Sequence, residues 1–174
     1  MPIQPMPDRS WMPGRSSIAS ALQFTPAEWH LLVRLPRQVL IAATSAEHDT
    51  AKHTVAEGLA GIEAIAAGRA SPSRLVRDVV AAIYAEPDDV PVAGELTDPE
   101  TGIASVLSEC RVAAELLADR TPAPDAAAYR AWLSDIATTV CAAARTGGLL
   151  GFGGTPVSEA ERLFLDELAA ALGS

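Results

Sequence analysis

The segment DAAAYRAWLSDIATTVCAAART, residues 125–146, has the pattern of a long buried α-helix. Its large apolar side chains recur at intervals of three or four residues, which places them on one side of a helix. Alanine, the strongest helix former, occupies many of the other positions. The side chains predicted to face the core are Tyr129, Trp132, Leu133, Ile136, Val140 and Ala143.

Comparable patterns lie outside this segment, and no stretch alternates as a β-strand does. Thr25, Pro26 and Glu28 form a capping-box motif with proline at the first helical position, so a helix is expected to begin there. Pro36 falls inside that helix and predicts a kink. The sequence therefore predicts an all-α, multihelical fold of about six helices, over residues 25–43, 54–68, 71–83, 97–117, 125–146 and 158–172.

The helix expected over residues 54–68 follows the general rule that large apolar residues face the core. Val55, Leu59, Ile62 and Ile65 recur at helical spacing and are predicted to point inward. Thr54 stands three residues before Glu57, so this pair is expected to cap the start of the helix.

The length of 174 residues is close to that of one domain. Residues 17–174 are predicted to form a single all-helical domain whose core needs no disulfide or metal. Residues 1–16 (MPIQPMPDRSWMPGRS) contain too many prolines for a regular helix or a central strand. We expect a proline-rich N-terminal arm. Its Trp11 and Met12 either clamp it onto the body or a neighbouring subunit, or belong to a loose tail.

The charge of the chain excludes several classes of partner. A formal net charge of −9 repels phosphate backbones, so nucleic-acid binding is not expected. No lysine or arginine lies between Arg77 and Arg111, where acidic residues are frequent. This acidic stretch predicts either a surface for cations or a basic partner, or an ordinary solvated face. No apolar run approaches the ~20 residues that span a bilayer, and no signal peptide is recognisable, so a cytoplasmic protein without a membrane partner is expected.

A candidate metal site lies in residues 47–57, EHDTAKHTVAE. His53 and Glu57 are one helical turn apart, and Asp49 precedes them by another turn, while His48 is adjacent. One or two imidazoles with two carboxylates can bind a divalent transition metal, with water completing the shell. The alternative is structural: Asp49 is a good N-cap and Glu57 completes a capping box. Lys52 beside the cluster would oppose a bound cation.

The other candidate functional features of the sequence are better explained by structural roles. The glycine-rich loop over 147–154 joins two predicted helices and lacks the Lys-Ser/Thr pair of a phosphate-binding loop. Cys110 and Cys141 lie in apolar helical stretches without a CxxC motif, so inert buried thiols are expected. His30 has no partner nearby in the sequence. No nucleophile elbow or acid/base pair is recognisable.

An internal similarity relates residues 49–65 to residues 153–169. In both, small residues lead to Thr54-x-x-Glu57 or Ser158-x-x-Glu161 and then to an apolar helix; independent capping boxes would produce the same match. Together with the segment TGGLLGFGGTPVSEAE, this arrangement resembles the tellurite-resistance-associated TerB-like superfamily. The resemblance implies a multihelical fold with a pseudo-twofold pair of loop–helix units and a role in stress response that involves a metal. Because Gly153 replaces a carboxylate in the second copy, it places any ion site at Asp49 and Glu57.

Two functions from different classes follow from the sequence. The first is a non-enzymatic helical module that binds a partner protein, a second copy of itself as a homodimer, or an ion. The second is a small metal-dependent enzyme with His53, Asp49 and Glu57 as ligands, which would require open coordination positions in a concave pocket. The absence of a recognisable acid/base set favours the module.

Overall fold

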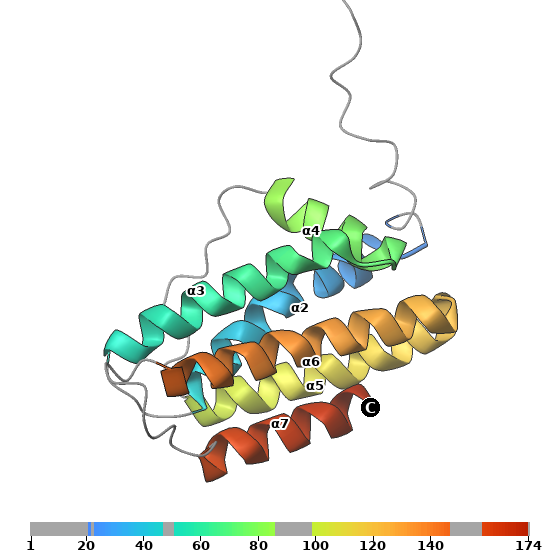
Figure 1. Cartoon of the computed structure of the whole chain (residues 1–174). Coiled ribbons are helices and arrows are strands. Elements are labelled where there is room, and N and C mark those ends of the chain that lie inside the picture. Colours follow the sequence, from blue (N-terminus) through green and yellow to red (C-terminus); the bar gives the residue numbers. More distant parts are fainter. Residues whose placement is uncertain (1–20, 22, 47–50, 86–98, 147–157, 174) are drawn as a thin grey trace, which may run out of the picture.

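The computed structural model (Figure 1) describes residues 21, 23–46, 51–85, 99–146 and 158–173. In these ranges it contains α-helices, one short 3-10 helix and no strand, so the all-α prediction is confirmed. The N-terminal arm lies outside the described residues. The elements are α2 (Pro26–Ser45), α3 (Ala51–Ala67), η1 (Gly68–Ala70), α4 (Arg74–Ala85), α5 (Pro99–Arg120), α6 (Ala123–Thr146) and α7 (Glu159–Leu172).

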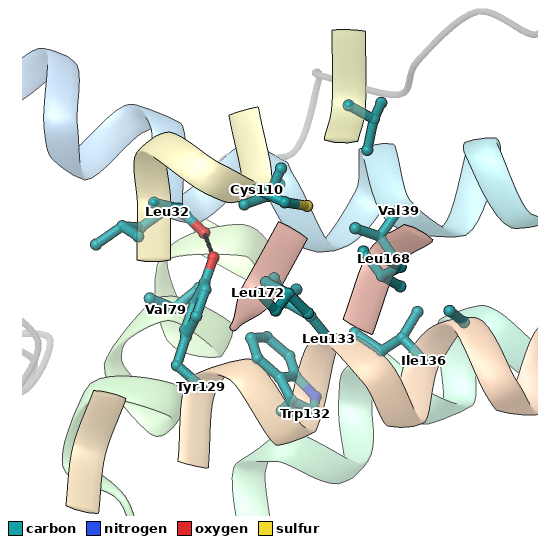
Figure 2. Close-up of a cluster of buried hydrophobic side chains, with 14 of the residues drawn as sticks. Leu32, Val39, Val79, Cys110, Tyr129, Trp132, Leu133, Ile136, Leu168 and Leu172 are labelled. Atoms are coloured by element: carbon teal, nitrogen blue, oxygen red, sulfur yellow. Dashed lines mark hydrogen bonds between the residues drawn. The ribbon is translucent and has the colours of Figure 1, made fainter. Parts of the chain in front are cut away.

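Helix α6 is the centre of the fold. It packs against α2, α3, α4, α5 and α7, and Figure 1 shows it with α5 between α3 on one side and α7 on the other. Its predicted inward residues, except Ala143, belong to one core with side chains of α2, α4, α5 and α7 (Figure 2). The α6 side chains that are buried in this core include Tyr129, Trp132, Leu133, Ile136 and Val140.

The predicted capping chemistry is present at two helix starts. The Thr25 hydroxyl accepts from the Glu28 backbone N–H at 3.3 Å, and the Glu28 carboxylate accepts from the Thr25 N–H at 2.7 Å. Ser158 and Glu161 form the same reciprocal pair at the start of α7. Each box satisfies N–H groups that have no partner within the helix, so the local sequence is sufficient to place these two ends.

Helix α2 runs through Pro36 without ending, as the sequence predicts. Proline has no N–H, so the carbonyl of Leu32, four residues earlier, loses its normal helical donor. The buried Tyr129 hydroxyl of α6 donates to that carbonyl at 2.7 Å instead (Figure 2). A side chain from another helix therefore completes the backbone hydrogen bonding of α2.

Two predicted helix starts are wrong. Helix α3 already begins at Ala51, so Thr54 lies inside it and does not cap its start. Helix α4 begins at Arg74 and not at residue 71, because Ser73 provides the cap. The Ser73 hydroxyl accepts from the Val76 N–H at 3.4 Å and donates to the Asp125 carboxylate of α6 at 2.5 Å. The hydrogen bond to Asp125 of α6 explains why Ser73 caps the helix and Ser71 does not. The local sequence offers both serines and does not distinguish between them.

Candidate functional site: the outer face of α3

The buried side of helix α3 carries Glu57, Gly61 and Ile65, and Gly68 follows on the same side just past the helix end. A Cβ atom added to Gly61 would lie 2.5 Å from Leu40 Cδ1 and 2.9 Å from Val140 Cγ2. A Cβ atom added to Gly68, which follows the helix directly, would lie 2.8 Å from both Trp132 and Val80. Both distances are below van der Waals contact, so the two glycines let α3 approach α2 and α6 more closely than other residues would allow.

The large apolar residues of α3 face solvent as a consequence. Val55 is 73% exposed, Leu59 is 59% exposed and Ile62 is 55% exposed, whereas Ile65 is only 3% exposed. The sequence prediction that all four point inward is therefore wrong for the first three. The physical reason is the close approach at Gly61 and Gly68: rotating α3 to bury its large side chains would place them where no room exists for a Cβ atom.

These exposed residues form one continuous line, which we call the α3 stripe: Val55, Leu59, Ile62 and the half-buried Ala66. Their spacing of four, three and four residues is that of the a and d positions of a heptad. Such a line stays on one side of a helix for three turns. Single exposed apolar residues are common on soluble proteins, whereas a contiguous line of them on one helix face is unusual and makes this face the candidate site.

The surroundings of the α3 stripe are small and nearly uncharged. Ala56 and Gly58 flank it on the described part of the helix, and an added Cβ at Gly58 would meet nothing within 4 Å. Glu63 is the exposed acid beside it. Just past the end of the helix, the guanidinium of Arg69 lies 4.1 Å from the centre of the Tyr84 ring of α4.

Of the predicted metal residues, only Glu57 has a side chain that the structure describes. Asp49 and His48 lie outside the described residues, and the side chain of His53 does also. Glu57 is 6% exposed, on the side of α3 opposite the α3 stripe. In the part of the chain that the structure describes, no group of three or more His, Cys, Asp or Glu side chains is placed to hold a metal. The metal site at residues 48–57 and the enzyme that depends on it stay predictions.

The internal similarity pairs residues with unlike positions in their helices. Ser158 precedes α7, whereas Thr54 lies within α3. Glu57 and Glu161 are nevertheless both buried. Helix α3 packs mainly on α6 and α7 mainly on α5, and the pseudo-twofold duplication stays a prediction.

Both cysteines are buried, as the sequence predicts. Burial and the nearby Glu109 raise the pKa of the Cys110 thiol to about 12, and Arg111 opposes this only in part. At neutral pH this thiol is protonated and a poor nucleophile. Burial also raises the pKa of Tyr129 well above its usual value.

The Cys110 thiol makes the stability of the protein sensitive to alkaline pH. Its pKa rises from 9.0 in the unfolded reference to about 12 in the folded state, so the folded protein retains a proton that the unfolded chain loses. We expect Cys110 to have little effect below about pH 8 and to lower the free energy of unfolding by about 1.4 kcal/mol by pH 10. Urea titrations of the wild type and Cys110→Ala at pH 7 and 10 measure this loss. An equal pH dependence in both proteins would contradict the prediction.

Two open surface grooves border α6. The larger, about 620 Å³, lies between α6 and the end of α3 and is lined mainly by small residues together with Trp132, Asp135, Thr138 and Thr139. The smaller, about 390 Å³, lies beside Arg130, Ser134 and Asp135. In both described grooves the carboxylate is that of Asp135, with no second acid and no histidine, so neither supplies an acid/base pair.

The acidic stretch between Arg77 and Arg111 is not one surface in the described residues. Asp78 is buried, 3.6 Å from Arg74, and Glu109 forms an ion pair of 2.8 Å with Arg34 of α2. These two acids are therefore paired with arginines, and residues 86–98, which hold most of the acids of the stretch, lie outside the described residues. Among the described helices, none combines the length and hydropathy needed to cross a bilayer.

Comparison with known proteins adds no family to this description. No protein-family model, curated protein or solved structure matches the chain. The class that the structure defines is an all-α helical domain with an exposed apolar helix face.

Proposed function

We propose that this protein is a helical interaction module that binds another helix through the α3 stripe. One observation supports the proposal above the others: α3 turns Gly61 towards the core and exposes Val55, Leu59 and Ile62. A helix whose only role is to cover the core gains stability by the opposite arrangement. The arrangement is explained if a partner covers the outer face.

The chemistry of the surface favours a helical partner. Apolar residues at intervals of four and three positions match the anchors of a helix packed along a groove or seam. Burying each large side chain of the α3 stripe would contribute about 1–2 kcal/mol, which suits a reversible interaction. The resemblance to TerB-like proteins, a role in stress response and a cytoplasmic location remain compatible predictions.

The proposal is tested by photocrosslinking in the expressing cell. Benzoylphenylalanine placed at position 59 is expected to form adducts with a protein chain, identified by mass spectrometry of the crosslinked peptide. The matched control is position 163 on α7, because Leu163 is also a leucine that is 59% exposed. We expect little adduct from that position.

Three results would contradict the proposed function. Adducts of equal yield from positions 59 and 163 would indicate random collisions. Adducts formed only within a single molecule would mean that another part of that molecule covers its α3 stripe. A lack of adducts from position 59 would mean that no partner covers it in the cell.

A further inference from the structure

We infer that the partner on the α3 stripe is a second copy of this chain, paired so that the two α3 helices run antiparallel across a twofold axis. The inference rests on the proposed function and specifies its partner. It follows from the spacing of the α3 stripe, from the charges beside it and from the open space at Gly58.

The order of the residues in the α3 stripe is self-complementary. In an antiparallel pair of helices each a position lies opposite a d position of the other helix. Leu59 then packs against Ile62 of the second copy, and Val55 against Ala66 of the second copy. The twofold axis repeats both contacts, which makes four apolar layers and leaves no stripe residue without an apolar partner. A twofold axis also closes the assembly at two chains.

The charges favour a second copy over a charged partner. A partner selected by charge would require several acids or bases along the seam; among the described side chains, Ala56 and Gly58 are uncharged, Glu63 is an exposed acid and Arg69 lies beyond the helix end. In the antiparallel pair, Glu63 lies opposite Ala56 of the second copy, so the two carboxylates do not face each other. The antiparallel orientation also places the opposite ends of the two helix dipoles side by side.

The backbone geometry permits the close contact that short side chains require. Nothing lies within 4 Å of a Cβ added to Gly58, so the second helix meets no side chain at this position. Beyond the end of α3, the Tyr84 ring of α4 is 46% exposed, and the Arg69 guanidinium lies 4.1 Å from its centre. Four layers make a small interface, and we expect a dissociation constant on the order of 10 µM.

Sedimentation equilibrium of the purified full chain tests the association. The average mass is expected to rise from 18.1 kDa towards twice that value with concentration. Leu59→Glu should weaken the dimer at least about tenfold, because it places a carboxylate opposite Ile62 of the second copy. Leu163→Glu, at the same exposure on α7, should leave the dimer unchanged. Circular dichroism should show that both variants keep their helices, since both side chains are exposed.

Salt dependence separates an apolar seam from a charged one. Each copy carries a formal net charge of −9, so the two copies repel at long range and salt screens that repulsion. We expect the dimer to strengthen as salt increases. A dimer that dissociates with added salt would overturn the apolar pairing.

Engineered cysteines test the orientation. The antiparallel pair places residue 55 of one copy opposite residue 66 of the other, so Val55→Cys with Ala66→Cys should form a disulfide-linked dimer under mild oxidation. Val55→Cys alone should not, because the two copies of residue 55 would lie about 16 Å apart along the axis, beyond disulfide reach. Cys110 and Cys141 are buried and should not contribute.

The outcomes separate this inference from the proposed function. Crosslinking of Val55→Cys alone would indicate a parallel pair and overturn the orientation. A protein that stays monomeric at all concentrations, with adducts from position 59 to a different protein in the cell, would overturn self-pairing but leave the interaction module intact. A monomer without adducts from position 59 would overturn both.

Discussion

Gly68→Ala is expected to lower the free energy of unfolding by about 2–3 kcal/mol, whereas Gly58→Ala, ten residues earlier, should raise it by about 0.5–1 kcal/mol. The added methyl at position 68 would lie 2.8 Å from Trp132 Cε2 and 2.8 Å from Val80 Cγ2. The Trp132 ring is rigid, and its Nε1–H donates to the Ala64 carbonyl at 3.2 Å. Moving the ring therefore costs packing and weakens that hydrogen bond.

The second substitution provides the control. Gly58 is helical and has open space around its Cα, so alanine there only reduces the conformational entropy of the unfolded chain. Urea unfolding should be followed at concentrations where the chain is monomeric. Equal effects of the two substitutions would show that α3 does not depend on a close approach at its C-terminal end. The explanation for the exposed α3 stripe would then fail.

Tyr129→Phe is expected to cost about 2 kcal/mol of unfolding free energy, because it leaves the buried carbonyl of Leu32 without a donor. That carbonyl depends on Tyr129 because Pro36 has no N–H. Pro36→Ala restores a backbone N–H at the position from which a helix normally bonds residue 32. In the Pro36→Ala background, Tyr129→Phe should therefore cost less than about 1 kcal/mol.

A double-mutant cycle of urea unfolding measures this coupling. The four proteins are the wild type, the two single variants and the double variant. Loss of packing around Pro36 is common to both sides of the cycle and cancels. If Tyr129→Phe costs the same with proline and with alanine at position 36, the hydroxyl does not replace the missing helical donor.

Much of the fold could be predicted from local sequence. The reciprocal contacts of Thr25 with Glu28 and of Ser158 with Glu161 involve residues three positions apart. They form in any context where the helix forms, so a sequence motif identifies them. The inward face of α6 was also predictable, since its large residues are all on one side and its neighbours surround that side.

The candidate site was not predictable by the same rule. Their helical spacing identifies Val55, Leu59 and Ile62 as one helix face, but the rule that large apolar residues face the core predicts that this face is buried. The signal against it was present in the sequence: Gly61 and Gly68 are seven residues apart and share the opposite side of the helix. A glycine inside a helix usually lowers the stability of that helix. Only the proximity of Leu40, Val140 and Trp132 shows that these two glycines are required for the close packing of α3.

The positions of the helices and the chemistry of several of their ends thus follow from interactions within a few residues, which the order of the amino acids contains directly. The orientation of α3, the donor for the Leu32 carbonyl and the choice of Ser73 as a cap depend on side chains from other helices. The two hydrogen bonds join residues more than 50 positions apart, Ser73 with Asp125 and Leu32 with Tyr129, and the contacts at Gly61 and Gly68 join different helices. They arise only when steric exclusion and hydrogen bonding act across the packed helices.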